Sequence, residues 1–225
     1  MDQTIEPSGS TLSAMAAEKI SAAIIRGDLP PGSRLAIRQL SAELDIGPTP
    51  IREGLTGLAG RGLVIAFGQR GFRVADVSRH DLQDLIMART AIETAALRQA
   101  IAKGDADWEG AVAAALQRLK HFSSYPPKTL EERVSDFERL NLGFHTALIS
   151  GCNSSRLIAL TEDLHRQAQR YRNLMLRMRD ISPNAYDEHR ELAELALGRD
   201  ADRACSRLAE HNRITMKLIY GDPEV

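Results

Sequence analysis

Paired helix-start and helix-stop signals recur from Ser78 to the end of the chain, and they constrain the fold more than any other feature. Each expected helix opens on a side chain that can accept hydrogen bonds from first-turn amides, and most end near a glycine or proline. The expected segments run from Ser78 to about Lys103, from about Asp107 to Phe122, from Thr129 to about Ser150, from about Ser154 to Met178, from Ser182 with Pro183 as its first helical residue to about Gly198, and from Asp200 onward. Six helices in succession predict a helical bundle.

The composition agrees with helices packed on helices. Hydrophobic residues make up 43% of the 225 residues and aromatic residues only 4%, and a chain of this length predicts one or two domains. No run approaches about 18 consecutive apolar residues, so we expect no membrane-spanning helix. The chain shows no signal-peptide pattern, and its two cysteines, Cys152 and Cys205, lack metal or redox spacing. These features together predict a cytoplasmic protein.

The first 76 residues contain shorter elements. Three amphipathic helices are expected, separated by Gly27 with the turn LPPGSRL and by Gly47, and a two-stranded hairpin follows, built from LVIAF, a turn at GQRG, and FRV. The residues expected to face the core are Met15, Ile20, Ala23 and Ile24 in the first helix, Ile37, Leu40 and Leu44 in the second, and Ile51, Leu55 and Leu58 in the third. This order is that of a winged helix-turn-helix. The predicted fold is therefore mainly α, with a winged helix-turn-helix DNA-binding domain at residues 1–76 and an all-helical bundle at residues 77–225.

The third helix has an abrupt start. Pro48 and Pro50 stiffen its entry, and Thr49 and Arg52 fall at its N-terminal end, the part that reaches DNA in this fold. The net charge of −1 gives no support to nucleic-acid binding, but residues 34–73 carry six arginines against three acidic residues. A local excess of three positive charges can neutralise phosphates in a chain that is nearly neutral as a whole.

Two long stretches resemble a known family. The segment GDLPPGSRLAIRQLSAELDIGPTPIREGLTGLAGRGLV, followed by RGFRV, closely resembles the DNA-binding domain of the GntR superfamily of bacterial transcription regulators. The remainder resembles the ligand-binding domain of the FadR-like branch, in ARTAIETAALRQAI, FHTALISGCN and EHRELAELALGRDADRACSRLAEHNRI. The resemblance implies that residues 77–225 bind an effector. The helical faces left after one bundle forms, and the two half-sites that winged helices bind, imply a homodimer.

The resemblance also places DNA contacts on individual residues. These are Arg38, Thr49, Arg52, Arg70 and Gly71, the last two at the tip of the wing. Arginine can bind phosphate or the O6/N7 edge of guanine, and glycine permits close backbone approach. The chain departs from the commonest family pattern with Gly47 where serine is frequent and Pro48 where arginine often contacts a base. An operator sequence therefore cannot be transferred from relatives.

The six histidines fall into two groups. His80, His121 and His165 have polar neighbours and are expected to be solvated. His145, His189 and His211 interrupt apolar helical stripes instead. His189 lies about ten residues before the tight turn between the last two helices, and His211 about twelve after it, which places them at nearly the same height in antiparallel helices.

Two interpretations of His145, His189 and His211 remain open. They are either separate core histidines with hydrogen-bond partners or one metal site with an open coordination position. The resemblance favours the metal site, because many FadR-like members bind a divalent metal with matching histidines. The family often has an aspartate where this chain has Asn141, whose neutral amide oxygen is a weaker ligand. Imidazole-rich ligation suits zinc or nickel rather than magnesium or calcium.

Arg89 and Glu93 lie four residues apart on an apolar helix face. They form either a partly buried intrahelical ion pair or a site in which Arg89 points into a cavity and binds an acidic effector. The similar family position lines the effector pocket.

Together, these patterns predict a ligand-responsive bacterial transcription regulator that acts as a homodimer on a double-stranded, pseudopalindromic operator. A small organic acid, in contact with the metal or separate from it, would shift the dimer between DNA-competent and incompetent states. A metal-dependent enzyme and a metal sensor are the alternatives. Against an enzyme, the chain has no HExxH motif and no carboxylate base at metalloprotease spacing.

Overall fold

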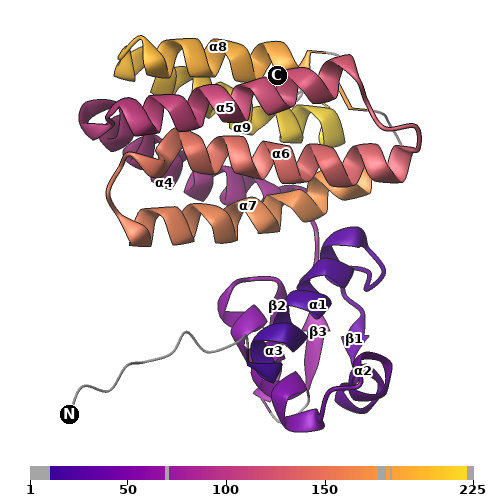
Figure 1. Ribbon diagram of the computed structural model, residues 1–225. Helices are drawn as coiled ribbons and strands as arrows, with labels where there is room; N and C mark the ends of the chain where they lie inside the picture. The colour runs from indigo at the N-terminus through magenta and orange to yellow at the C-terminus, as the bar shows by residue number, and fades with distance from the viewer. Residues whose placement is uncertain (1–10, 69–70, 177–180, 183, 222–225) are drawn as a thin grey trace, which may run out of the picture. The chain divides into compact units, whose positions relative to one another are not determined.

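The computed structural model describes residues 11–68, 71–176, 181–182 and 184–221. The chain divides into two compact units, residues 1–77 and residues 78–225 (Figure 1). Each unit has a hydrophobic core of its own. The mainly helical fold class predicted from the sequence is confirmed.

The first unit is a winged helix. Its elements are α1 (Leu12–Arg26), β1 (Arg34–Leu35), α2 (Ile37–Leu44), α3 (Pro48–Gly60), β2 (Val64–Ala66) and β3 (Phe72–Val74). The predicted hairpin is β2 and β3, but β3 also pairs with β1, so the sheet order is β1-β3-β2. The prediction of a plain turn over LPPGSRL was therefore wrong. A strand of two residues is too short to show an alternating pattern, and its pairing with distant β3 creates it.

Most of the predicted core of this unit is present. Ile51, Leu55 and Leu58 of α3 are fully buried, and Ile20 and Ile24 of α1 are nearly so. Met15 was predicted to face inward but is 36% exposed, and its neighbour Ala16 is fully buried. The buried stripe of α1 is Ala16, Ile20 and Ile24, four residues apart, and Met15 lies beside it. Ala16 lies where α1 and α3 approach closely at Gly54.

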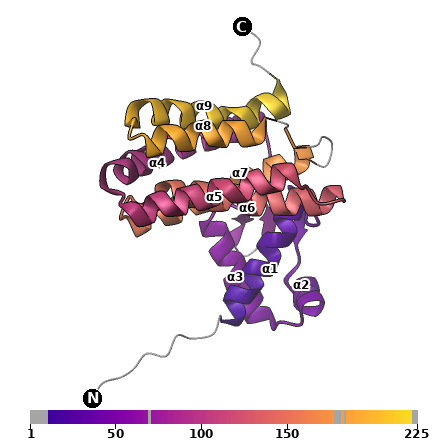
Figure 2. The same cartoon turned by 45° about the horizontal axis from the view of Figure 1, so that its top comes forward.

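The second unit is an all-helical bundle. Its helices are α4 (Arg79–Lys103), α5 (Ala106–Ser124), α6 (Leu130–Ser150), α7 (Ser155–Leu176), α8 (Ala185–Leu197) and α9 (Ala201–Tyr220). Figures 1 and 2 show α5 beside α6 and α8 beside α9, and α4 packs against α6, α7 and α9. In the part of the chain that is described, no helix is long and apolar enough to cross a membrane.

The N-cap residues explain where most of these helices begin. The Ser78 hydroxyl accepts a 3.0 Å hydrogen bond from the Asp81 amide, and Thr129 and Glu132 form a reciprocal capping box. The prediction that Ser182 caps the fifth helix was wrong. The Ser182 hydroxyl accepts from the Asn184 amide in a preceding turn, and α8 begins at Ala185. Pro183 and Met178 lie outside the described residues.

The residues on either side of the junction are each held within their own unit. In the first unit, the Ala75 amide donates to the Leu63 carbonyl at 3.1 Å. In the second, the buried Tyr171 hydroxyl of α7 accepts from the Ser78 amide at 3.2 Å, and a close hydrogen bond links the same hydroxyl to the Asp81 carboxylate. Burial and the Asp81 carboxylate raise the pKa of Tyr171, so the hydroxyl keeps its proton.

We expect Gly54→Ala to destabilise the first unit. A Cβ at this position would lie 3.0 Å from the Ala17 nitrogen and the Ser13 oxygen of the α1 backbone, which forces the two helices apart. Overpacking of this kind costs about 1–3 kcal/mol. Gly57→Ala in the same helix is the matched control, because its Cβ would meet open space and should stabilise α3 by about 0.5–1 kcal/mol. Amide hydrogen exchange of α1 and α3 measures both changes, and equal protection in the two variants would contradict the close contact.

Candidate functional site

The start of α3 carries the predicted DNA-binding residues on an exposed surface. Gly47 precedes the helix without a side-chain cap, and the first three helical residues are Pro48, Thr49 and Pro50. Since proline has no amide proton, only Thr49 leaves an amide in this stretch that needs a partner. Thr49 and Arg52 are both exposed. The helix can therefore start abruptly and still present these two side chains outward.

The other predicted DNA contacts lie on α2 and the wing. Arg38 is exposed on α2. Gly71 has a φ of 102°, which favours glycine, and a Cβ there would meet no atom within 4 Å. Arg70 lies outside the described residues. The backbone at Gly71 is thus open to close approach by a partner.

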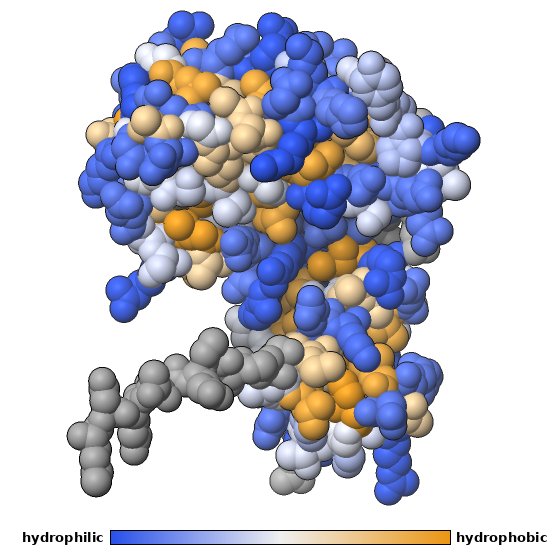
Figure 3. Space-filling model, viewed as in Figure 1, coloured by the Kyte–Doolittle hydropathy of each residue, from blue (hydrophilic) through white to orange (hydrophobic). Residues whose placement is uncertain are grey.

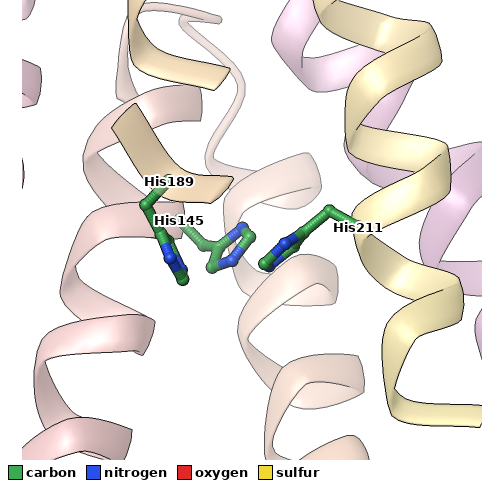
Figure 4. A group of neighbouring side chains, drawn as sticks. All are labelled: His145, His189 and His211. Carbon is green, nitrogen blue, oxygen red and sulfur yellow. The ribbon is translucent and has the colours of Figure 1, made fainter. Parts of the chain in front are cut away.

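The second unit brings together the three histidines singled out from the sequence. His145 comes from α6, His189 from α8 and His211 from α9. Their rings converge in the bundle, and one nitrogen of each lies within 4.8 Å of the others (Figure 4). His145 and His189 are 3% and 1% exposed. Side chains that lie 22 to 66 residues apart in the sequence therefore meet in one largely buried cluster.

Hydrogen bonds determine which nitrogen of His189 is free. Its Nδ1 lies 2.5 Å from the Ala185 carbonyl oxygen, so Nδ1 carries the proton and donates. Its Nε2 faces Oδ1 of Asn141 at 2.9 Å. In a neutral ring Nε2 has only a lone pair, as has the amide oxygen. Two acceptors therefore face one another without a proton between them.

Two further nitrogens of the cluster lack partners. Nε2 of His145 and Nδ1 of His211 are buried and have no hydrogen-bond partner among the described residues. His211 Nδ1 lies 3.4 Å from an oxygen of Glu188, a contact that becomes an ion pair only if the ring is protonated. Because unsatisfied buried polar atoms are rare, these nitrogens indicate a missing bonding partner such as a cation.

Burial keeps the whole cluster neutral. Burial, together with the positive groups nearby, lowers the pKa of His189 and of His211 to about 3. Burial also holds the pKa of His145 well below its ordinary value. Neutral imidazole is the form that binds metal ions, so the site requires no proton release from these rings to accept one.

His165 was predicted to be solvated, and this prediction was wrong. The ring is fully buried on α7, between Nη2 of Arg172 at 3.0 Å from its Nε2 and Nη2 of Arg89 at 3.4 Å from its Nδ1. Burial and these two guanidinium groups hold the pKa of His165 well below its ordinary value. His80 and His121 are exposed, as expected.

The sequence pattern did not predict the buried face of α7, because most of its side chains are polar. It includes Thr161, His165, Ala168 and Arg172, spaced four, three and four residues apart, and all four are buried. This is the spacing of a core-facing helical stripe. Helical spacing alone does not identify this face, because every face of a helix has it and three of these four side chains are polar.

Two buried ion pairs hold the arginines beside the cluster. Arg89 Nε donates to Glu93 at 2.8 Å, so the intrahelical pair predicted as one alternative is present, and both side chains are almost fully buried. Arg172 donates through Nε and Nη2 to the two oxygens of Glu138, at 2.9 and 2.7 Å. Glu93 also accepts from the Asn212 amide at 3.1 Å. The carboxylates balance both positive charges, which is what burial of an arginine requires.

A single pocket joins these groups. It has a volume of about 70 Å³, below the range of drug-sized ligand sites, so it suits an ion together with a very small ligand. Its walls include both arginines, Asn141 and the three clustered histidines, together with apolar side chains from α6, α8 and α9. Figure 3 shows a largely hydrophilic face of the second unit, with scattered apolar patches. Polar groups also lie inside this unit, where they line the pocket.

A winged helix joined to a helical unit with an internal polar pocket defines a DNA-binding transcription regulator with an effector domain. The family model for bacterial regulatory proteins of the gntR family matches residues 12–74, and that for the FCD domain matches residues 84–213. The chain therefore belongs to the GntR family of bacterial transcription regulators.

Individual relatives agree with this assignment. The chain is 34% identical to an uncharacterized HTH-type transcriptional regulator, BphR of Paraburkholderia xenovorans, over 90% of this chain and 82% of the relative. It is 32% identical to the HTH-type transcriptional repressor GlaR of Escherichia coli, over 84% of this chain and 86% of the relative. The structure of E. coli McbR/YncC has a TM-score of 0.75 at 20% identity, covering 94% of this chain and 98% of that one, and shows the same fold. The regulatory interpretation is supported, and the enzyme alternative is not.

We expect the metal-free protein to lose stability as the pH falls below about 6.5. The buried histidines bind protons more weakly in the folded chain than in the unfolded chain, so stability is full above the unfolded pKa of about 6.5 and declines toward the folded values near 3. Urea unfolding of chelator-treated protein between about pH 8 and pH 5 measures this. Trp108, the single tryptophan, is buried in the second unit and reports on that unit.

His145→Leu should flatten this pH dependence, because one buried imidazole no longer has to be kept neutral. The matched control is His121→Leu, which changes an exposed ring outside the cluster. Equal stability of the metal-free wild type across this pH range would contradict the assignment.

Proposed function

We propose that the chain is a ligand-responsive regulator whose operator binding is controlled by a small organic acid in the pocket of the second unit, with a divalent transition metal as part of that site. The supporting observation is the convergence of three neutral imidazoles in a pocket that two arginines also line, with Nε2 of His145 and Nδ1 of His211 buried and without hydrogen-bond partners among the described residues. Histidines with a purely structural role in the core are expected to have hydrogen-bond partners for their ring nitrogens.

The residues present fit a metal ion. His145, His189 and His211 would hold it, with Asn141 as a fourth ligand through its amide oxygen. Three neutral imidazoles and an amide suit zinc or nickel and disfavour magnesium or calcium. The Ala185 carbonyl would fix the tautomer and orientation of His189, as outer hydrogen bonds do for metal-bound histidines. When bound, the ion would supply a positive charge that attracts a carboxylate.

Arg89 is the proposed effector-binding residue. It lines the pocket, and its Nε already binds Glu93, which holds the guanidinium in place. Nη2 lies 3.4 Å from Nδ1 of His165, which leaves Nη1 for a ligand. A carboxylate beside it would form charge-assisted hydrogen bonds in a site with little water. The positive charges of the ion and of Arg89 together favour an acid over a neutral ligand.

On the DNA side, we propose contacts from Arg38, Thr49, Arg52, Arg70 and Gly71. The exposure of Arg38, Thr49 and Arg52 supports this assignment. Two copies of the winged helix in a homodimer would bind the two half-sites of a pseudopalindromic operator. Since its target would be bacterial chromosomal DNA, the cytoplasm is the proposed compartment.

Arg52→Ala should weaken operator binding by about 1–3 kcal/mol if Arg52 contacts a base. The probe is a DNA fragment selected from a random library by the purified protein, titrated by fluorescence anisotropy at fixed salt. Arg26→Ala is the control, because it removes an equal charge from the last turn of α1, where Arg26 pairs with Asp28. Unchanged affinity in Arg52→Ala would show that this residue does not contact the operator.

Replacing His145, His189 or His211 with alanine should sharply lower the zinc or nickel retained after dialysis, because each removes one ligand. Asn141→Asp should raise affinity, since a carboxylate is a stronger ligand than an amide. In the folded protein, protons should compete with the metal only as the pH approaches the pKa of His189 and His211, about 3, so affinity should change little between about pH 8 and pH 5. The measurements are metal content and thermal shift with added metal or chelator. Retention of metal by the triple alanine variant would place the ion elsewhere.

A further inference from the structure

His165 is surrounded by hydrogen-bond donors. Arg172 Nη2 lies 3.0 Å and Asn141 Nδ2 lies 3.4 Å from its Nε2, and Arg89 Nη2 lies 3.4 Å from its Nδ1. A guanidinium group can only donate, so the nearest one decides where the lone pair must be. The shorter contact is at Nε2, which therefore accepts, and the single proton of the neutral ring is on Nδ1.

The position of Arg172 is itself fixed. Its guanidinium binds both oxygens of the buried Glu138, and the rigid fork of that pair leaves Nη2 directed at His165. The tautomer of His165 is thus determined by the buried Arg172–Glu138 pair. Among the described residues, this pair makes no hydrogen bond to His145, His189 or His211.

The amide of Asn141 faces two rings and can take either of two orientations. With Nδ2 toward His165, it lies 3.4 Å from Nε2 and shares that lone pair with Arg172 Nη2 in a three-centre hydrogen bond, and its oxygen faces His189 at 2.9 Å. With the amide reversed, the oxygen would meet the lone pair of His165, and Nδ2 would donate to Nε2 of His189. The reversed amide would occupy the nitrogen that His189 offers to a metal. Only the first orientation leaves both an amide oxygen and an imidazole lone pair available.

We propose that His165 is a positioning residue that holds the Asn141 amide with its oxygen toward the His145–His189–His211 cluster. This inference rests on the proposed metal site. It explains how an amide can serve where a carboxylate would need no such help, because both carboxylate oxygens are acceptors and either orientation presents one. A separation of 2.9 Å between the two lone-pair atoms also suits two ligands of one ion with bonds of about 2.1 Å.

The test is a double-mutant cycle between His165 and Asn141, with Co²⁺ as the probe. Chelator-treated wild type, His165→Phe, Asn141→Asp and the double variant are titrated with Co²⁺, and the d–d absorption gives both the dissociation constant and a signature of the ligand set. Phenylalanine keeps a ring of similar size but cannot accept the amide hydrogen bond. His121→Phe is the matched control on an exposed surface.

His165→Phe should weaken Co²⁺ binding by about 10–100-fold when residue 141 is asparagine, the range found for outer-shell partners of metal ligands. In the Asn141→Asp background the same substitution should change the affinity by less than about threefold, because no amide remains to be oriented. Binding of Co²⁺ by the double variant also shows that His165→Phe folds.

Three results would overturn the inference. His165→Phe with wild-type affinity would show that the ring does not orient the amide. Equal losses in the asparagine and aspartate backgrounds would show that the ring acts only through packing. Failure of the wild type to bind Co²⁺, zinc or nickel would remove the proposed metal site, and this inference with it, and is distinguished from the first two results by the wild-type titration alone.

Discussion

The arrangement of the helical unit depends on keeping charged and polar side chains inside a bundle of helices. Arg89 and Arg172 are buried because Glu93 and Glu138 neutralise them at hydrogen-bond distance. A buried pair of this kind contributes little net stability, yet removing one partner leaves an unpaired charge that costs several kcal/mol. The Arg172–Glu138 pair joins α7 to α6, and the Arg89–Glu93 pair within α4 is joined to α9 through Asn212. The imidazoles beside these pairs are held neutral by the same surroundings.

The two units differ in where they place their functional polar side chains. The winged helix buries a small apolar core and leaves its functional side chains exposed, at the start of α3. The helical unit has its apolar core around Trp108 and Phe144 and sets its polar pocket next to that core. One unit is built to present charge to a partner outside it, and the other to enclose charge.

Much of the fold could be predicted because its signals are local. Caps such as Ser78 and the Thr129–Glu132 box act within one helical turn, and they were located correctly. Features that depend on distant partners could not be found in this way. Strand β1 forms only because it pairs with β3. The burial of His165 depends on Arg89, which is 76 residues away on α4, and on Arg172, which lies on the same polar face of α7.

The residues of the candidate site also differ in whether a local sequence signal identifies them. His145, His189 and His211 were found because each interrupts an apolar stripe, and their height could be estimated from helix lengths. The pairing of Arg172 with Glu138 spans 34 residues and has no local signal. The hydrogen bonds that hold His165 next to Asn141 could therefore not be predicted from the sequence. Hydrophobicity identifies polar residues in apolar surroundings, but it overlooks polar residues that bury one another.

The hydrogen bonds at the junction limit the slack between the two units. Ala75 is tied to Leu63 in the first unit, and Ser78 is tied to Tyr171 in the second. Only Asp76 and Val77 lie between these two anchored residues. Three residue steps of extended chain span roughly 10 Å at most. The connection is therefore a short tether rather than a flexible linker, and Ala75 and Ser78 cannot lie farther apart than this length unless a hydrogen bond at one end breaks.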